Sequence, residues 1–128
     1  MIVLDASAVV AILNGEPERE QLMPRLIREA DKAISPMSRV EVVMALARKY
    51  ADPVPTVEAF LERYSVALLP VDALQADWSV RAFLLFGKGR HPARLNLGDC
   101  FSYAAAKALN APLLYIGNDF AKTDIKAA

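Results

Sequence analysis

Four carboxylates stand where the chain could bring them together: Asp5, Glu41, Asp99 and Asp119. Clustered carboxylates repel one another and raise one another's pKa values, and a divalent cation removes that repulsion. Oxygen ligands suit Mg²⁺ or Mn²⁺, whereas a lone His91 and a lone Cys100 cannot build a zinc site. Because Mg²⁺ favours phosphate oxygens as further ligands, the acids point to metal-assisted attack on a phosphodiester.

The elements that must position these acids alternate along the chain. Strands are expected at 2–4, 33–34, 66–69 and 113–116, and helices at 6–13, from 17 onward, 38–51, 56–64, 72–86 and 99–109. This alternation predicts an α/β fold whose parallel sheet is covered on both faces. Asp5 and Asp119 then follow strands, and Glu41 and Asp99 begin helices on the same side of the sheet. All four acids can face one cleft.

Each acid also has a simpler explanation. Ser38 and Glu41 match a capping box, in which the helix start alone would explain the glutamate. Asp99 in a first helical turn would complement the helix dipole. Asp119 and Asp124 could be turn or cap residues. Asp5 is harder to explain in this way, because a charge directly after a buried apolar run risks desolvation.

Basic residues lie close in sequence to two of the acids. The loop before Asp99 carries Lys88, Arg90, His91 and Arg94, and Arg39 lies just before Glu41. Such side chains could contact phosphates without reading sequence. The alternative is a solvated basic loop without a ligand. Trp78, Phe83, Leu84 and Phe86 are expected in the core or at a protein interface, and the sequence leaves that choice open.

The composition bounds the class of protein. The 128 residues are most simply one domain, and 55% are hydrophobic, enough for a sizeable core. Fifteen basic residues balance fifteen acidic ones, so any nucleic-acid binding must come from a local patch. A single cysteine suits a reducing cytosol. The apolar start, residues 1–13, lacks a basic region and is too short to span a bilayer, which predicts a soluble, cytoplasmic protein.

Several short stretches together resemble the PIN-domain ribonucleases, and specifically the VapC toxins of type II toxin–antitoxin pairs. They are Asp5-Ala6-Ser7, Glu41 in an early helix, Asn96-Leu97-Gly98-Asp99-Cys100-Phe101, Gly117-Asn118-Asp119-Phe120 and Thr123-Asp124-Ile125. The loop Gly89-Arg90-His91-Pro92-Ala93 resembles one VapC subgroup. The resemblance covers essentially the whole chain, and the ordered set is more specific than any single motif.

The resemblance implies one PIN domain over residues 1–128, a three-layer α/β/α sandwich that cleaves RNA with Mg²⁺ or Mn²⁺. It implies that Asp5 and Asp99 are direct metal ligands, that Glu41 lies close by and that Asp119 acts through water. Three residues would support the site: Ser7, Asn118 and Asp124. Substrate contacts would come from Arg39, Arg90, His91 and Arg94. The expected partners are an RNA, a transfer RNA being one candidate, a second copy of the chain, and a VapB-type antitoxin whose tail fills the active-site groove.

Other functions are possible for such a fold, but each fits the sequence less well. Haloacid-dehalogenase-like phosphatases need a second aspartate where this chain has Ser7, and a receiver domain needs a lysine in a context that Lys122 does not offer. A catalytically inactive PIN-like module that binds RNA or protein would not need the four acids. A PIN nuclease of RNA processing usually carries extra segments beyond a bare domain.

Overall fold

Four short strands form one parallel sheet in the order β3-β2-β1-β4. The computed structural model describes residues 1–128. The strands are β1 (Ile2–Leu4), β2 (Lys32–Ile34), β3 (Val66–Leu68) and β4 (Leu113–Leu114). All three pairings are parallel, with β1 at the centre between β2 and β4. The predicted α/β fold with a parallel sheet is therefore confirmed.

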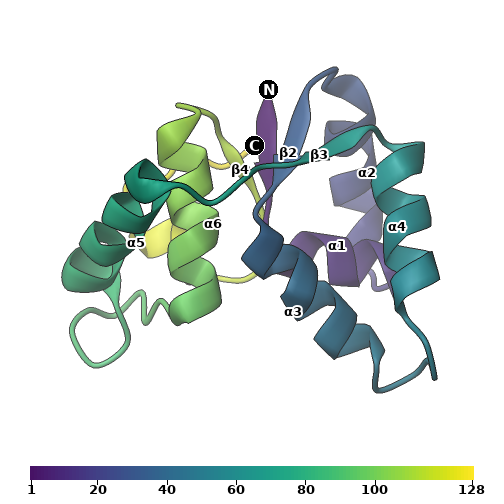
Figure 1. Ribbon diagram of the computed structural model, residues 1–128, viewed down its shortest axis with the longest axis horizontal. Coiled ribbons are helices and arrows are strands. Elements are labelled where there is room, and N and C mark those ends of the chain that lie inside the picture. Colours follow the sequence, from purple (N-terminus) through teal and green to yellow (C-terminus); the bar gives the residue numbers. More distant parts are fainter.

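Helices cover both faces of the sheet (Figure 1). They are α1 (Ala6–Leu13), α2 (Arg19–Arg28), α3 (Pro36–Leu46), α4 (Val54–Arg63), α5 (Ala73–Phe86) and α6 (Leu97–Ala108), and a short 3₁₀ helix, η1 (Phe120–Lys122), follows β4. Helices α5 and α6 lie on one side of the sheet, and α1, α2 and α4 lie on the other. Helix α3 packs against both α1 and α6, so it joins the two layers.

The central strand divides the core. Ile2 and Leu4 belong to a cluster with side chains from α1 to α4, whereas Val3 belongs to a second cluster with α5 and α6. Successive side chains of a strand point to opposite faces, so one apolar tripeptide holds both layers. Asp5 follows immediately, and the backbone N–H of Asp5 donates to the carbonyl of Leu114 at 2.9 Å. The first acid is thereby fixed at the carboxyl ends of β1 and β4.

Four helix starts differ from the sequence prediction. Helix α2 begins at Arg19 rather than at Pro17, and α6 begins at Leu97 rather than at Asp99. Helix α3 begins at Pro36, and the cap is Ser35, whose hydroxyl accepts from the N–H of Met37 at 3.3 Å. Proline fits the first turn because it has no N–H to satisfy. The capping box predicted for Ser38 and Glu41 is therefore wrong, and Ser38 is fully buried inside the helix. Helix α4 begins at Val54 rather than at Thr56.

The chain ends beside β4. The N–H of Leu113 donates to the carbonyl of Lys126 at 2.8 Å, and the N–H of Ala128 donates to the carbonyl of Leu113 at 2.9 Å. The last residues thus cover the edge strand and complete its hydrogen bonds. None of the helices combines the length and the apolar character needed to cross a membrane.

Candidate active site

Asp5 is the most deeply buried acid of the site, with 5% of its surface exposed. It caps α1: its Oδ2 accepts from the backbone N–H of Ser7 at 2.9 Å and from the Ser7 hydroxyl at 2.6 Å. Its Oδ1 accepts from the Ser102 hydroxyl of α6 at 2.5 Å. These three donors satisfy the acceptor oxygens of the carboxyl group in its buried position. The predicted role of Ser7 inside the site agrees with its contacts.

Two serines of the site, Ser38 and Ser102, were not predicted from the sequence. Both are fully buried, and their hydroxyl oxygens lie 2.8 Å apart. A signal was present: Ser38 precedes Glu41 by three residues, and Ser102 follows Asp99 by three. On a helix that spacing places each serine on the same face as its acid.

Glu41 projects from α3 towards the first turn of α6. A Cβ atom added at Gly98 would overlap the Glu41 carboxyl group, so only glycine leaves room for this approach. Burial, together with the charges of Asp5 and Asp99, raises the pKa of Glu41 from 4.5 to about 7. Asp5, Glu41 and Asp99 therefore lie close enough to repel one another electrostatically.

Asp99 forms a capping box with Asn96 at the start of α6. The Asn96 side chain accepts from the N–H of Asp99 at 2.8 Å, and Asp99 Oδ2 accepts from the N–H of Asn96 at 3.0 Å. Burial raises the pKa of Asp99 to about 6 against the effect of the Asn96 hydrogen bond, and the charges of Asp5 and Asp119 contribute to the rise. Asp99 both caps its helix and belongs to the acidic cluster.

Asp119 reaches the cluster from the loop after β4. The turn before it contains Gly117 with φ +93°, a left-handed conformation that glycine adopts without strain. Asp119 is exposed and lines a pocket of about 230 Å³ with Asp99 and Asn96. Lys88 and Arg94 line the same pocket, and no hydrophobic residue does. Two acids and two bases thus surround one polar hollow, Asp99 from α6 and the other three from loops.

Asp124 lies away from this pocket. Its Oδ1 accepts from the Tyr103 hydroxyl at 2.9 Å, and its Oδ2 pairs with the Lys107 ammonium group at 2.7 Å. Burial opposes the ionisation of Asp124, but the hydrogen bonds from Lys107 and Tyr103 outweigh it, so the pKa of Asp124 is lowered. Asp124 thereby ties the C-terminal segment to α6. Asn118, predicted to support the last acidic loop, is exposed.

The other basic candidates are engaged elsewhere. Arg90 donates through Nε to the carbonyl of Leu84 at 3.2 Å, and its guanidinium lies 5.7 Å from the ring centre of Phe83. His91 packs edge-on against Phe86, and its Nδ1 accepts from the N–H of Ala93 at 3.0 Å. Both residues shape the loop whose ends are joined between Gly87 and Leu95.

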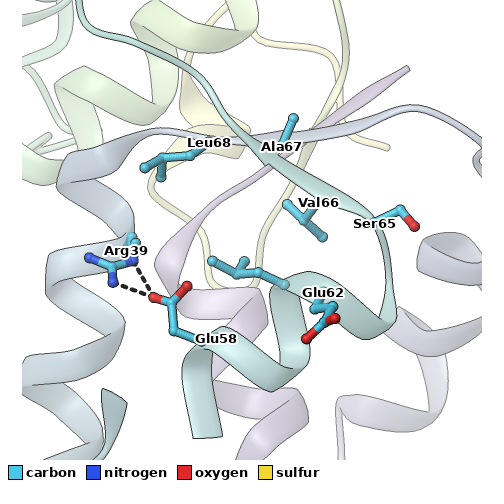
Figure 2. Close-up of a pocket in the computed structure, with 8 residues that line it drawn as sticks. Arg39, Glu58, Glu62, Ser65, Val66, Ala67 and Leu68 are labelled. Carbon is cyan, nitrogen blue, oxygen red and sulfur yellow. Dashed lines mark hydrogen bonds and ion pairs between the residues drawn. The ribbon is translucent and has the colours of Figure 1, made fainter. Parts of the chain in front are cut away.

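Arg39 points to a different surface (Figure 2). Its guanidinium pairs with the Glu58 carboxylate of α4, and both residues line a pocket beside β3. Although it follows Ser38 directly, one residue along a helix turns a side chain by about 100°. Of the four predicted substrate contacts, only Arg94 lines the polar hollow beside Asp99 and Asp119.

The number of acidic side chains close to one another indicates which cation the site could hold. No three His, Cys, Asp or Glu side chains stand close enough to hold a metal ion by themselves. Mg²⁺ keeps several waters and is commonly held through only one or two carboxylates, so an open acidic cluster suits it. Zinc would require a nearly complete set of protein ligands, which these residues do not form.

Comparisons with known proteins agree on one family. The family model described as "PIN domain" matches residues 2–126. The chain is 42% identical to a ribonuclease VapC of Mycolicibacterium smegmatis, with 98% of each chain covered. It is 39% identical to ribonuclease VapC30 of Mycobacterium tuberculosis, covering 97% of this chain and 95% of the relative.

Solved structures share the fold. The crystal structure of Mycobacterium tuberculosis VapC20, described as a toxin that cleaves the sarcin–ricin loop, has a TM-score of 0.78 at 17% identity, with 100% of this chain and 98% of the other covered. VapBC-1 from nontypeable Haemophilus influenzae has a TM-score of 0.75 at 20% identity, with 100% and 97% covered.

Proposed function

The chain belongs to the PIN-domain family, and from that membership we propose that it is a VapC-type toxin, an endoribonuclease that depends on Mg²⁺ or Mn²⁺. One observation supports this proposal most directly. Asp5, Glu41 and Asp99 lie near one another at the carboxyl edge of the sheet, beside a polar hollow lined by Asp99 and Asp119. Residues 1–128 act as one PIN domain in this proposal.

Asp5 and Asp99 would hold the cation, with Glu41 and Asp119 beside them. When bound, the cation supplies a positive charge that activates water and stabilises the negative charge developing on the phosphodiester. It also offsets the mutual repulsion of the carboxylates. The protein's own contribution is to keep the acids in place: Ser7 and Ser102 hold Asp5, the capping box holds Asp99, and Gly98 admits Glu41.

Lys88 and Arg94 would bind the RNA backbone. Both line the hollow that also contains Asp99 and Asp119, so a phosphate held by these cations would lie next to the acids. Contacts of this kind orient a nucleic acid without reading its sequence. Arg90 and His91 would act indirectly by shaping the loop, and Arg39 would reach RNA only after leaving Glu58.

The retained acids favour an active nuclease over a silent binding module, because a scaffold gains nothing from carboxylates that raise one another's pKa values. The identity to VapC ribonucleases over nearly the whole chain favours a toxin over a nuclease of RNA processing. It also supports a VapB-type antitoxin as the partner that blocks cleavage. A cytoplasmic location fits RNA as the substrate.

We also propose that the chain forms a homodimer. Exposed apolar side chains gather on α5 and at the start of α6: Val80, Phe83, Leu84 and Leu97. Three of them, Val80, Phe83 and Leu97, line an apolar groove of about 550 Å³. Burying such a surface against a second copy would stabilise the pair. Light scattering on the purified chain measures the mass, and a monomer at micromolar concentration contradicts the proposal.

One experiment tests the enzymatic function. The purified chain is incubated with RNA and Mg²⁺ or Mn²⁺, with and without a chelator, beside the variant Asp99→Asn. Asparagine can still accept the N–H of residue 96, so the helix cap survives the change. We expect cleavage that requires the cation and is abolished in the variant. Asp77→Asn, an exposed change on α5, is the matched control and should cleave normally. Cleavage in the presence of chelator, or by Asp99→Asn, would overturn the assignment.

A further inference from the structure

The two oxygens of the Asp5 carboxylate are held differently. Each carboxylate oxygen offers about two acceptor positions. Oδ2 receives two donors, the N–H and the hydroxyl of Ser7. Oδ1 receives only one, the hydroxyl of Ser102. Oδ1 is therefore the oxygen of Asp5 that retains an acceptor position for a ligand.

The direction of the hydrogen bonds follows from counting protons. A serine hydroxyl carries one hydrogen. Ser102 uses it for Asp5 at 2.5 Å, a length typical of a hydroxyl bound to a charged oxygen. The contact of 2.8 Å between Ser38 and Ser102 then requires Ser38 to be the donor. The bonds run one way, from Ser38 to Ser102 to Asp5.

This relay connects the elements that carry the acids. Ser38 lies one turn from Glu41 on α3, Ser102 lies one turn from Asp99 on α6, and Asp5 follows β1 as the cap of α1. Both hydroxyls are fully buried, so water does not compete with them. A buried polar pair is stable when all of its members are satisfied, and it then fixes one arrangement of its surroundings.

We propose that Ser102 is a positioning residue that holds Asp5 Oδ1 in the orientation needed to bind the divalent cation, and that Ser38 acts only through Ser102. The inference rests on the proposed function, because it takes Asp5 as a ligand of the cation. Residues that orient a ligand commonly change metal affinity about 10- to 100-fold when they are replaced.

The test measures Mn²⁺ affinity by calorimetry on the full chain, without RNA. Four variants are compared with the wild type: Ser38→Ala, Ser102→Ala, the double variant, and Ser79→Ala. Ser79 is a matched control, because its buried hydroxyl donates to the carbonyl of Gln75 inside α5 and does not touch an acid. Thermal unfolding of each variant records the loss of stability separately.

We expect Ser102→Ala to weaken Mn²⁺ binding about tenfold or more. Ser38→Ala should weaken it less, and the double variant should bind Mn²⁺ as Ser102→Ala does, because Ser38 has no separate route to Asp5. Ser102→Ala leaves the Ser38 hydroxyl without its acceptor and should lower the melting temperature. The double variant removes that orphaned group, so it keeps the measurement possible if the single variant unfolds.

Unchanged Mn²⁺ affinity in Ser102→Ala, an equal loss in Ser79→Ala, or no Mn²⁺ binding by the wild type would each overturn the inference. A further loss in the double variant would overturn the role given to Ser38. If the variants follow the expected order but the wild type cleaves no RNA, the proposed function fails and the positioning role stands. The two failures are therefore distinguishable.

Discussion

Glu41 of α3 lies against Gly98 in the first turn of α6, so closely that a Cβ atom at position 98 would overlap its carboxyl group. The two residues are far apart in sequence, but the position of the Glu41 carboxyl group leaves no room for a side chain at residue 98. Glycine inside a helix costs about 1 kcal/mol relative to alanine. The close approach of Glu41 therefore explains why α6 has a glycine in its first turn despite this cost.

The substitution Gly98→Ala tests this relationship. The new methyl group should displace the Glu41 side chain, whose end is flexible, while the fold is kept. A shift of about 1 Å in an active site can reduce the rate about 100-fold, and we expect a loss of that order in RNA cleavage. The double variant Gly98→Ala, Glu41→Gln should cleave no more slowly than Glu41→Gln alone. Normal cleavage by Gly98→Ala would contradict the role of the contact.

Replacing Lys88 and Arg94 by alanine should weaken RNA binding at all sequences. Each lost phosphate contact should reduce the slope of log affinity against log salt by about 0.7–1. Filter binding at several salt concentrations, with the catalytically silent Asp99→Asn background, measures the slope. Arg39→Ala is the control, because Arg39 pairs with Glu58 on another surface. If Arg39→Ala flattens the slope and the double variant does not, the RNA path has been misplaced.

The stability of the metal-free protein should fall as the pH rises from about 4.5 to about 7. The pKa of Glu41 is raised from 4.5 to about 7 in the folded chain, so in this window the folded state holds a proton that the unfolded state has lost. Asp99 acts in the same direction up to about pH 6. Glu41→Gln should flatten the fall. Chemical unfolding with a chelator present measures it, and stability that rises through this window would refute the electrostatic account.

Tyr103→Phe should destabilise the chain by about 1 kcal/mol, since it removes the hydroxyl that donates to Asp124. Asp124 keeps its pair with Lys107, so the C-terminal segment should remain attached. The urea midpoint measures the effect. Mn²⁺ affinity should be unchanged, because this contact lies away from the acidic cluster; a large loss of affinity would instead place Asp124 in the site.

The sequence by itself determined the architecture and most of the acidic cluster. The apolar run Ile2, Val3 and Leu4 indicates a strand buried on both faces, and the alternation of strands and helices predicts a parallel sheet. A parallel sheet places its strand ends and helix starts on one side. With that geometry Asp5, Glu41, Asp99 and Asp119 can all face one cleft, and the resemblance to PIN-domain ribonucleases implied that they do. In the structure the charges of Asp5 and Asp99 act on Glu41, and those of Asp5 and Asp119 act on Asp99, so the four acids lie within electrostatic reach of one another.

Only the tertiary structure decided which serines and which basic residues lie beside these acids. Ser38 matched a helix cap in sequence, but Ser35 and Pro36 begin the helix one turn earlier, and Ser38 faces Ser102 instead. Among the basic residues, sequence proximity to Asp99 did not distinguish Arg94 from Arg90. The direction of a side chain depends on how its element packs against distant ones, and the contact between Asp5 and Ser102 joins residues 97 positions apart. Local patterns specify which acids gather, whereas the packing of α3 against α6 specifies what holds them.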